Sequence, residues 1–478
     1  MINKHINKSP RLFGTDGVRG IANLELSCEL ALNIGRGMVF VLGKKYKKNI
    51  KKILIGKDTR ISSDMLESAI QAGICSMGAD VISLGIVPTP AVAFLVTELK
   101  ADAAVMISAS HNSFEFNGIK IFDKNGHKLD NITEDEIEYF VHNNQEIIFN
   151  NNKNIKNTKN IKIGKVLHAI DNEDYISKYV NNICDNLINI KNNLNFDFEN
   201  FKILIDCANG SGCIYVEKLF EKLGVHHKIL FNNPDGININ NKCGSTDLEN
   251  LSKFVIENKY NLGLAYDGDA DRCIAIDETG RIIDGNYIMA LCALELSKNN
   301  KLEKNTVVGT CMANLGLILF LQNKNINFVE TDVGDRYILE NMTKNNYNFG
   351  GEESGHIIFK DISTTGDGLL TSAMIIDALI GNNMKSSDIL NLFKKIPEAL
   401  INIKAQNNDI EFANKVKRKI AEKCSFFSNK NKKIFKLFVR KSGTEPVIRI
   451  LVQSEDKLAL DNIENFIHKN FNVKDQRH

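Results

Sequence analysis

Short apolar runs alternate with helix-like patterns along most of the chain. Residues 52–56 (KILIG) form an apolar run typical of a buried strand, and a polar loop follows it. From Asp64 onwards, apolar positions recur at helical spacing, with Glu67 completing a capping box and Gly78 ending the pattern. This stretch predicts a strand, a loop and a helix in succession.

The same order of elements recurs twice further along the chain. An apolar run at 201–205 leads through a polar loop to a helix pattern that ends at Gly224, and a run at 306–309 leads to an apolar helix from Leu315. After residue 395 a charged helix and two β-like runs indicate a smaller α+β unit. We expect three tandem, similar α/β domains with mixed sheets and a smaller C-terminal α+β domain around a central cleft, at 1–155, 163–279, 280–395 and 396–478.

Composition and charge narrow the class of function. The 478 residues include 60 Lys and Arg against 58 Asp and Glu, so the net charge is only +2. No basic excess exists to neutralise a nucleic acid or an anionic membrane, and no run of about 18 apolar residues predicts a membrane span. The spacing of the ten cysteines is typical of free thiols. We expect a cytoplasmic protein that acts on small molecules, with no nucleic acid and no membrane as partner.

Three carboxylates stand between two strand-like runs, in the sequence DGDADR. An Asp-Gly hairpin turn accounts for the presence of Asp267 and Gly268. It does not account for Asp269 and Asp271, whose carboxylates and that of Asp267 repel one another unless a cation lies between them. Oxygen ligands favour Mg²⁺ over zinc or copper. An EF-hand calcium loop is excluded, because Arg272 stands where that loop needs Gly. The pattern predicts a magnesium site.

A hydroxyl and an imidazole follow another buried strand pattern at 103–107. Ser110 and His111, within SASHN, would stand at the mouth of that strand. Alone, the pair is explained as well by an ordinary turn or a helix cap. As a nucleophile the hydroxyl needs a base or a cation, for which Arg19, Lys120 and His111 are the candidates.

Two other loops offer groups suited to a sugar phosphate. RKSGTEP at 440–446 combines cations, hydroxyls and Gly as an oxyanion cradle does, although a polar hairpin turn explains it equally. Arg449 is a candidate second cation for the same phosphate. GEESGH at 351–356 supplies acceptors and donors that match sugar hydroxyls.

Together these motifs resemble the α-D-phosphohexomutase superfamily, and within it the branch of bacterial phosphoglucosamine mutases. The resemblance runs in order from FGTDGVRG at 13–20 through SASHN, DGDADR and GEESGH to RKSGTEP, and VGDRY at 333–337 supports the branch. It implies interconversion of glucosamine 6-phosphate and glucosamine 1-phosphate through a phosphoserine enzyme and a hexosamine 1,6-bisphosphate, which also primes the enzyme. This reaction would feed UDP-N-acetylglucosamine and cell-envelope synthesis.

The alternatives are three. A phosphomannomutase or phosphoglucomutase of the same superfamily is the nearest. A phosphatase-like enzyme would use Asp267 as its nucleophile, and a noncatalytic protein would only bind sugar phosphates.

The resemblance implies a role for each candidate residue. The catalytic residues would be Ser110 as the phosphoryl carrier, His111, Lys120 and Arg19, with the acid–base role left open between His111 and Lys120. One Mg²⁺ per subunit would be held by Asp267, Asp269, Asp271 and, through its phosphate, Ser110. The sugar would be bound by Glu352, Ser354, His356 and Arg272, and the phosphate that does not react by Arg440, Ser442, Gly443, Thr444 and Arg449.

Two departures from the family pattern bear on the site. Ser113 replaces the Pro that usually follows SHN, and Pro would stiffen the loop that carries Ser110. Ala270 stands where Gly is also common. The oligomeric state, monomer or homodimer, is left open.

Overall fold

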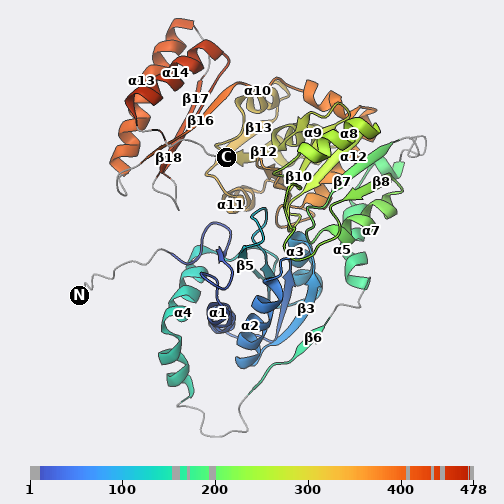
Figure 1. Cartoon of the computed structure of the whole chain (residues 1–478), viewed down its shortest axis with the longest axis vertical. Coiled ribbons are helices and arrows are strands. Elements are labelled where there is room, and N and C mark those ends of the chain that lie inside the picture. Colours follow the sequence, from blue (N-terminus) through green and yellow to red (C-terminus); the bar gives the residue numbers. More distant parts are fainter. Residues whose placement is uncertain are drawn as a thin grey trace.

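Four sheets with their own helices follow one another along the chain (Figure 1). The computed structural model describes residues 11–152, 162–168, 173–192, 201–404, 410–431, 435–441, 447–471 and 473. We call the four parts domains 1 to 4. In Figure 1, domain 1 (blue to teal) lies in the lower half and domain 4 (orange to red) at the upper left, while domain 3 lies beside domain 4 and domain 2 lies at the right. Three tandem α/β domains and a smaller α+β domain confirm the predicted fold class.

Domain 1 has a six-stranded sheet of order β1-β5-β4-β2-β3-β6, in which β5 runs antiparallel to both of its neighbours, β1 and β4, and the other pairs are parallel. Its elements are β1 (Val18–Ile21), α1 (Cys28–Tyr46), β2 (Lys52–Lys57), α2 (Ser63–Ser76), β3 (Asp80–Ile86), α3 (Thr89–Glu98), β4 (Ala103–Ile107), β5 (Phe116–Asp123), α4 (Asn131–Asn152) and β6 (Val166–His168). The expected capping box is wrong. Ser62 precedes α2, and Asp64 and Glu67 each accept a hydrogen bond from Lys57 Nζ at 2.5 Å instead.

Domain 2 has a five-stranded sheet of order β11-β10-β9-β7-β8. Its elements are α5 (Glu173–Asp185), α6 (Asn189–Asn192), β7 (Lys202–Asp206), α7 (Cys213–Leu223), β8 (His226–Leu230), α8 (Glu249–Asn258), β9 (Leu262–Tyr266), β10 (Cys273–Asp277) and β11 (Ile282–Ile283). The DGDADR sequence connects the antiparallel pair β9 and β10. It is therefore both a hairpin connection and a cluster of carboxylates.

Domains 3 and 4 complete the chain. Domain 3 has sheet order β13-β12-β14-β15, and domain 4 has the antiparallel sheet β16-β18-β17. Domain 3 contains α9 (Gly285–Lys298), β12 (Thr306–Thr310), α10 (Leu315–Asn323), β13 (Asn327–Thr331), α11 (Asp335–Asn345), β14 (Phe349–Gly351), β15 (Ile357–Phe359) and α12 (Gly368–Asn382). Domain 4 contains β16 (Glu398–Lys404), α13 (Ile410–Asn431), β17 (Phe435–Lys441), β18 (Val447–Ser454) and α14 (Lys457–Asn470).

Two short strands fall across the boundaries that we expect between domains. β6 lies in the range assigned to domain 2 but pairs with β3 of domain 1, and β11 follows residue 279 but pairs with β10 of domain 2. The sheets of domains 1 and 2 therefore each include one strand that lies beyond the boundary expected from the sequence. The exact domain limits stay a prediction.

Domains 1, 2 and 3 share an apolar core, whereas domain 4 has a separate one. The largest buried cluster contains residues of domains 1, 2 and 3, among them Val92, Tyr266 and Leu370. Domain 4 has its own cluster, around Ile401, Ile420 and Ile463. Among the described residues, none of the helices combines the length and the apolar character that a membrane crossing requires.

Candidate active site

Ser110 lies in a strained and buried turn directly after β4. Its φ is +55°, in the left-handed region that a non-glycine residue enters only at a cost of about 1–2 kcal/mol. The residue is 1% exposed, and its backbone N–H donates to Ser108 Oγ at 2.9 Å. Such strain persists only where the surroundings hold it, and it is frequent at functional sites.

The loops after β4 and β14, from domains 1 and 3, both contact the segment after β9 in domain 2, which carries the three aspartates. Ser110 Oγ donates to Asp267 Oδ2 at 2.5 Å, and His356 Nδ1 of the third loop lies 3.7 Å from Asp271 Oδ1. Cys273 N donates to Gly355 O at 3.0 Å and joins the second loop to the third. Three sequence motifs therefore form one site.

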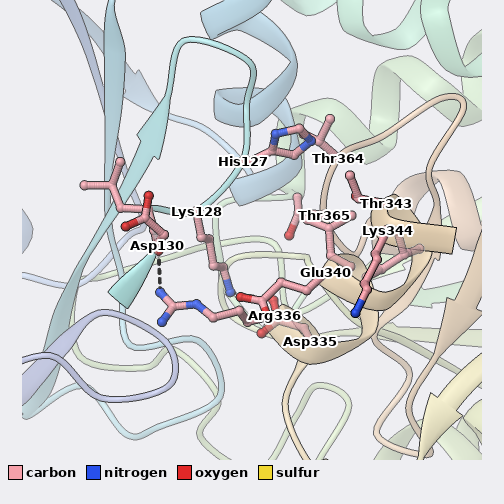
Figure 2. A pocket seen from close by; sticks show the side chains of 13 residues that line it. His127, Lys128, Asp130, Asp335, Arg336, Glu340, Thr343, Lys344, Thr364 and Thr365 are labelled. Atoms are coloured by element: carbon pink, nitrogen blue, oxygen red, sulfur yellow. Dashed lines mark hydrogen bonds and ion pairs between the residues drawn. The ribbon is translucent and has the colours of Figure 1, made fainter. Parts of the chain in front are cut away.

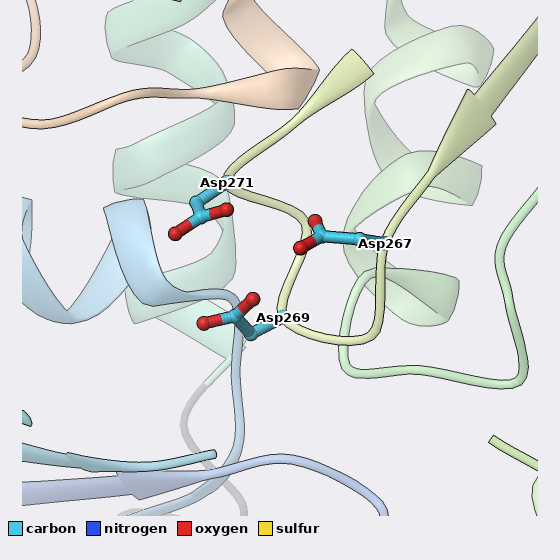
Figure 3. Close-up of side chains that lie close together, drawn as sticks. All are labelled: Asp267, Asp269 and Asp271. Atoms are coloured by element: carbon cyan, nitrogen blue, oxygen red, sulfur yellow. The ribbon is translucent and has the colours of Figure 1, made fainter. Parts of the chain in front are cut away.

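The three aspartates of the second loop point toward one another (Figure 3). One oxygen from each lies within 4.8 Å of the others, and the residues are 1%, 0% and 3% exposed. Burial, with repulsion from Asp271 and Asp269, raises the pKa of Asp267 well above its usual range. The Oδ1 atoms of Asp269 and Asp271 are buried and have no hydrogen-bond partner. Buried oxygens without a donor fit a hard divalent cation.

Lys120, on β5, supplies positive charge beside these carboxylates. Its Nζ lies 2.7 Å from Asp269 Oδ2, 3.3 Å from Asp271 Oδ2 and 3.1 Å from Asp16 Oδ2. Burial alone would lower the pKa of Lys120, but the surrounding carboxylates raise it well above its usual range. Lys120 is therefore an ammonium ion at neutral pH.

His111 differs from Lys120 in charge. Its Nδ1 lies 3.3 Å from Ser110 Oγ and 3.2 Å from an Arg272 guanidinium nitrogen. Burial, followed by the charges of Arg272 and Arg19, lowers the pKa of His111 to about 4. The imidazole is therefore neutral at pH 7 and has a nitrogen that can accept a proton.

The motif FGTDGVRG brings two more charged groups to the site. Arg19 donates to Asn112 Oδ1 at 3.1 Å and pairs with Asp16, and its Nε is buried without a partner. Asp16 also pairs with Lys128. Although burial opposes it, Lys120, Lys128 and Arg19 lower the pKa of Asp16 well below its usual range.

The third loop brings a carboxylate, a hydroxyl and an imidazole to the site. Glu352 Oε1 accepts a hydrogen bond from Gly334 N at 3.2 Å, and burial raises the pKa of Glu352. Ser354 Oγ is buried and has no partner, so it is available to a ligand. His356 lies between Asp271 and Asp335, with its Nε2 3.4 Å from Asp335 Oδ2.

Sequence reasoning missed Lys128 and Asp335, which join domain 1 to domain 3 beside the site. Their side chains are 2.6 Å apart, and both line a cavity of about 350 Å³ between the loop at 127–130 and α11 (Figure 2). Arg336 lines the same cavity and donates to Glu134 Oε1 at 2.6 Å. The position of Asp335 within VGDRY was the one signal available in the sequence.

Domain 4 contributes a pair of arginines on neighbouring strands. Arg440 of β17 stands directly opposite Arg449 of β18. Burial and the charge of Arg449 lower the pKa of Arg440, while Cys311, Asp332 and Glu352 of domain 3 act in the opposite direction. Arg440 therefore lies on the side of domain 4 that is near domain 3. Ser442, Gly443 and Thr444 lie outside the described residues.

Family models match the chain in four consecutive segments. Alpha/beta/alpha domains I, II and III of phosphoglucomutase/phosphomannomutase match residues 10–147, 173–280 and 284–396, and its C-terminal domain matches residues 400–469. The chain belongs to the phosphoglucomutase/phosphomannomutase family. This membership confirms the resemblance that the sequence motifs show.

Within this family, similar full-length relatives are phosphoglucosamine mutases. The chain is 45% identical over 449 residues to that of Acetivibrio thermocellus, covering 94% of this chain and 95% of the relative. It is 44% identical over 459 residues to that of Clostridium novyi, covering 96% and 98%. Both relatives are mutases, which is the enzyme class that the sequence predicts.

Solved structures of the family share the fold. A phosphoglucomutase/phosphomannomutase family protein from Burkholderia thailandensis has a TM-score of 0.76 at 19% identity, covering 97% of this chain and 99% of that one. Aspergillus fumigatus N-acetylphosphoglucosamine mutase, in complex with GlcNAc-6P and magnesium, has a TM-score of 0.64 at 16% identity, covering 96% and 95%.

Proposed function

We propose that this chain is a phosphoglucosamine mutase that interconverts glucosamine 6-phosphate and glucosamine 1-phosphate. The observation that carries the proposal is the hydroxyl of Ser110, buried and held 2.5 Å from one of three clustered aspartates. Relatives at 44–45% identity over nearly their whole length support the choice of sugar. The free thiols of all ten cysteines favour the reducing cytoplasm as its location.

Asp267, Asp269 and Asp271 would hold one Mg²⁺ per subunit. When bound, this ion supplies positive charge to the oxygens of a transferring phosphoryl group. The unpartnered oxygens of Asp269 and Asp271 support this assignment.

Ser110 would carry the phosphoryl group between substrates. The 1-hydroxyl of glucosamine 6-phosphate attacks the phosphorus atom, the bond from phosphorus to Ser110 Oγ breaks, and a 1,6-bisphosphate forms. After this intermediate turns over in the cleft, Ser110 Oγ attacks its 6-phosphate and glucosamine 1-phosphate leaves. The phosphoserine is restored, so no inorganic phosphate is released.

His111 and Lys120 would divide the proton transfers that these steps need. The neutral imidazole of His111 is suited to accept a proton, whereas the ammonium group of Lys120 is suited to donate one. Arg19 and Arg272, which flank Ser110 and His111, would balance the charge that develops on the phosphoryl oxygens.

The remaining candidates would hold the substrate. Glu352, Ser354 and His356 belong to the third loop, where the carboxylate of Glu352 and the unpartnered hydroxyl of Ser354 match the hydroxyls of the sugar. His356, whose Nε2 accepts from Gly366 N–H at 3.0 Å, would hold this loop against Asp271. Arg440 and Arg449, with the loop at 442–444, would bind the phosphate that does not react.

A coupled assay of the purified protein tests the proposal. With a hexose bisphosphate as primer, the 6-phosphates of glucosamine, glucose and mannose are compared, and inorganic phosphate is measured in parallel. We expect a strong preference for glucosamine 6-phosphate without phosphate release. Preference for glucose or mannose would make the chain another mutase of the family, and released phosphate would make it a phosphatase. Full activity of Ser110→Ala would exclude the phosphoserine mechanism.

A further inference from the structure

The carbonyl oxygens of Ser110 and Asn112 are held by the same two side chains. Arg60 Nη2 donates to Ser110 O at 3.0 Å and to Asn112 O at 2.6 Å. Asn240 Nδ2 donates to both oxygens at 2.9 Å. Two carbonyls that flank His111 are therefore fixed from two sides, and we call these four contacts the carbonyl clamp.

The two donors of the clamp come from different domains. Arg60 follows β2 in domain 1, is 2% exposed, and is itself fixed by Asp58 Oδ2 at 3.1 Å and by Phe116 O at 2.8 Å. Asn240 belongs to the segment between β8 and α8 in domain 2, and its backbone N–H donates to Ala208 O at 2.9 Å. Asn240 therefore ties the Ser110 turn to domain 2.

The Ser110 turn needs such support. Ser110 has φ +55°, a conformation that relaxes unless neighbouring groups hold it. Ser113 offers less help than a Pro would, since a ring at this position would fix the backbone from within the loop. Among the described contacts, Ser113 N–H donates no hydrogen bond, so Pro would remove none. The hydrogen bonds of the carbonyl clamp therefore restrain the backbone of residues 110–112, which has no Pro at position 113 to restrain it.

We infer that Arg60 and Asn240 are positioning residues that hold the hydroxyl of Ser110 in place for phosphoryl transfer. The inference rests on the proposed function, in which Ser110 carries the phosphoryl group. It also makes the placement of Ser110 depend on the docking of domain 2 against domain 1, because one half of the clamp crosses that interface.

Asn240→Gly tests the clamp, since it removes both hydrogen bonds and tolerates the positive φ of residue 240, +56°. Asn325→Gly is the matched control, because Asn325 is exposed, has φ +58° and lies far from Ser110 in domain 3. In the coupled assay we expect kcat of Asn240→Gly to fall by about tenfold to a hundredfold, with KM for the sugar phosphate changed less than about twofold. Hydrogen exchange at residues 108–113 should become faster in Asn240→Gly and stay unchanged in Asn325→Gly.

A second variant separates loss of loop stiffness from other damage. Ser113→Pro, added to Asn240→Gly, should restore a large part of kcat and slow the exchange at residues 108–113. Unchanged kcat and exchange in Asn240→Gly, equal losses in the control, or a double variant without rescue would each overturn the inference. A wild-type protein without mutase turnover would instead refute the proposed function, while the exchange measurement would still decide whether Asn240 holds the loop.

Discussion

Gly268 approaches Ser110 so closely that a Cβ atom on residue 268 would lie 2.6 Å from the Ser110 carbonyl oxygen. The same Cβ atom would lie 3.0 Å from Asn240 Nδ2. The loop of the three aspartates and the turn of Ser110 therefore touch through backbone atoms. Only glycine permits this approach, because any side chain would push the two loops apart.

Gly268→Ala should lower mutase activity by about tenfold or more, since it displaces Ser110 from Asp267 by a few tenths of an ångström to an ångström. Gly43→Ala serves as the control, because a Cβ atom there meets its nearest neighbour at an ordinary 3.4 Å. The measurement is kcat in the coupled assay, with circular dichroism to verify folding. Equal activity of the two variants would show that the contact is not needed.

The aspartate cluster predicts that Mg²⁺ stabilises the fold. Saturating Mg²⁺ should raise the Tm by roughly 2–5 °C, because it binds the folded state alone. In Asp267→Asn this rise in Tm should disappear. The Tm of this variant without Mg²⁺ should not be lower than that of the wild type, because the substitution removes the repulsion of Asp267 by Asp269 and Asp271. Asp461→Asn, an exposed position in α14, should retain the full response. A response that persists in Asp267→Asn would place the ion elsewhere.

Arg440 and Arg449 of domain 4 predict that loss of one arginine weakens substrate binding more than it slows phosphoryl transfer. Arg440→Met should raise KM for glucosamine 6-phosphate by about tenfold or more, with a smaller effect on kcat, because it removes one cation from a phosphate that does not react. Arg418→Met, on the exposed face of α13, controls for the loss of a charge in the same domain. A fall in kcat at unchanged KM would contradict the assignment.

Asp367 predicts a pH dependence of stability. It precedes α12 and accepts hydrogen bonds at Oδ1 from Leu370 N–H at 2.9 Å and Tyr179 O–H at 2.8 Å, and burial raises its pKa to about 6. The folded state therefore keeps a proton that the unfolded state loses near pH 4. The stability from this proton is complete below about pH 4 and is lost as the pH rises through 6, by roughly 3 kcal/mol.

Asp367→Asn isolates this effect, because an amide oxygen can accept both hydrogen bonds without ever carrying a charge. Relative to the wild type, its Tm should increase between pH 5 and pH 8. A difference in Tm that is constant over this range would show that Asp367 does not titrate there.

Much of the fold followed from the sequence because its signals are local. KILIG became β2, and the runs on either side of DGDADR became β9 and β10. The helix that begins near Asp64 was also predicted, but its capping box is not formed, because the helix begins at Ser63 and Asp64 lies inside its first turn. The carboxylates of Asp64 and Glu67 both pair with Lys57 of β2.

The site was predictable only in part. The motifs named Ser110 and the three aspartates, and the structure brings these residues together. The roles of Lys128 and Asn240 have no local signal, because their contacts join positions more than a hundred residues apart and depend on how the domains pack. VGDRY marks Asp335 but does not indicate its partner. The strain at Ser110 was equally hidden, since the sequence does not reveal the sign of φ.

The separate apolar core of domain 4 has a consequence for the exchange of substrate and product. Domains 1 to 3 share one buried cluster, so moving them apart would expose apolar surface. Domain 4 touches domain 3 through polar contacts such as Lys436 Nζ with Ala313 O at 2.9 Å and Leu315 N with Gln453 Oε1 at 2.8 Å. We therefore expect domain 4, rather than domains 1 to 3, to move when substrate and product are exchanged, because this movement breaks polar contacts without opening a shared apolar core.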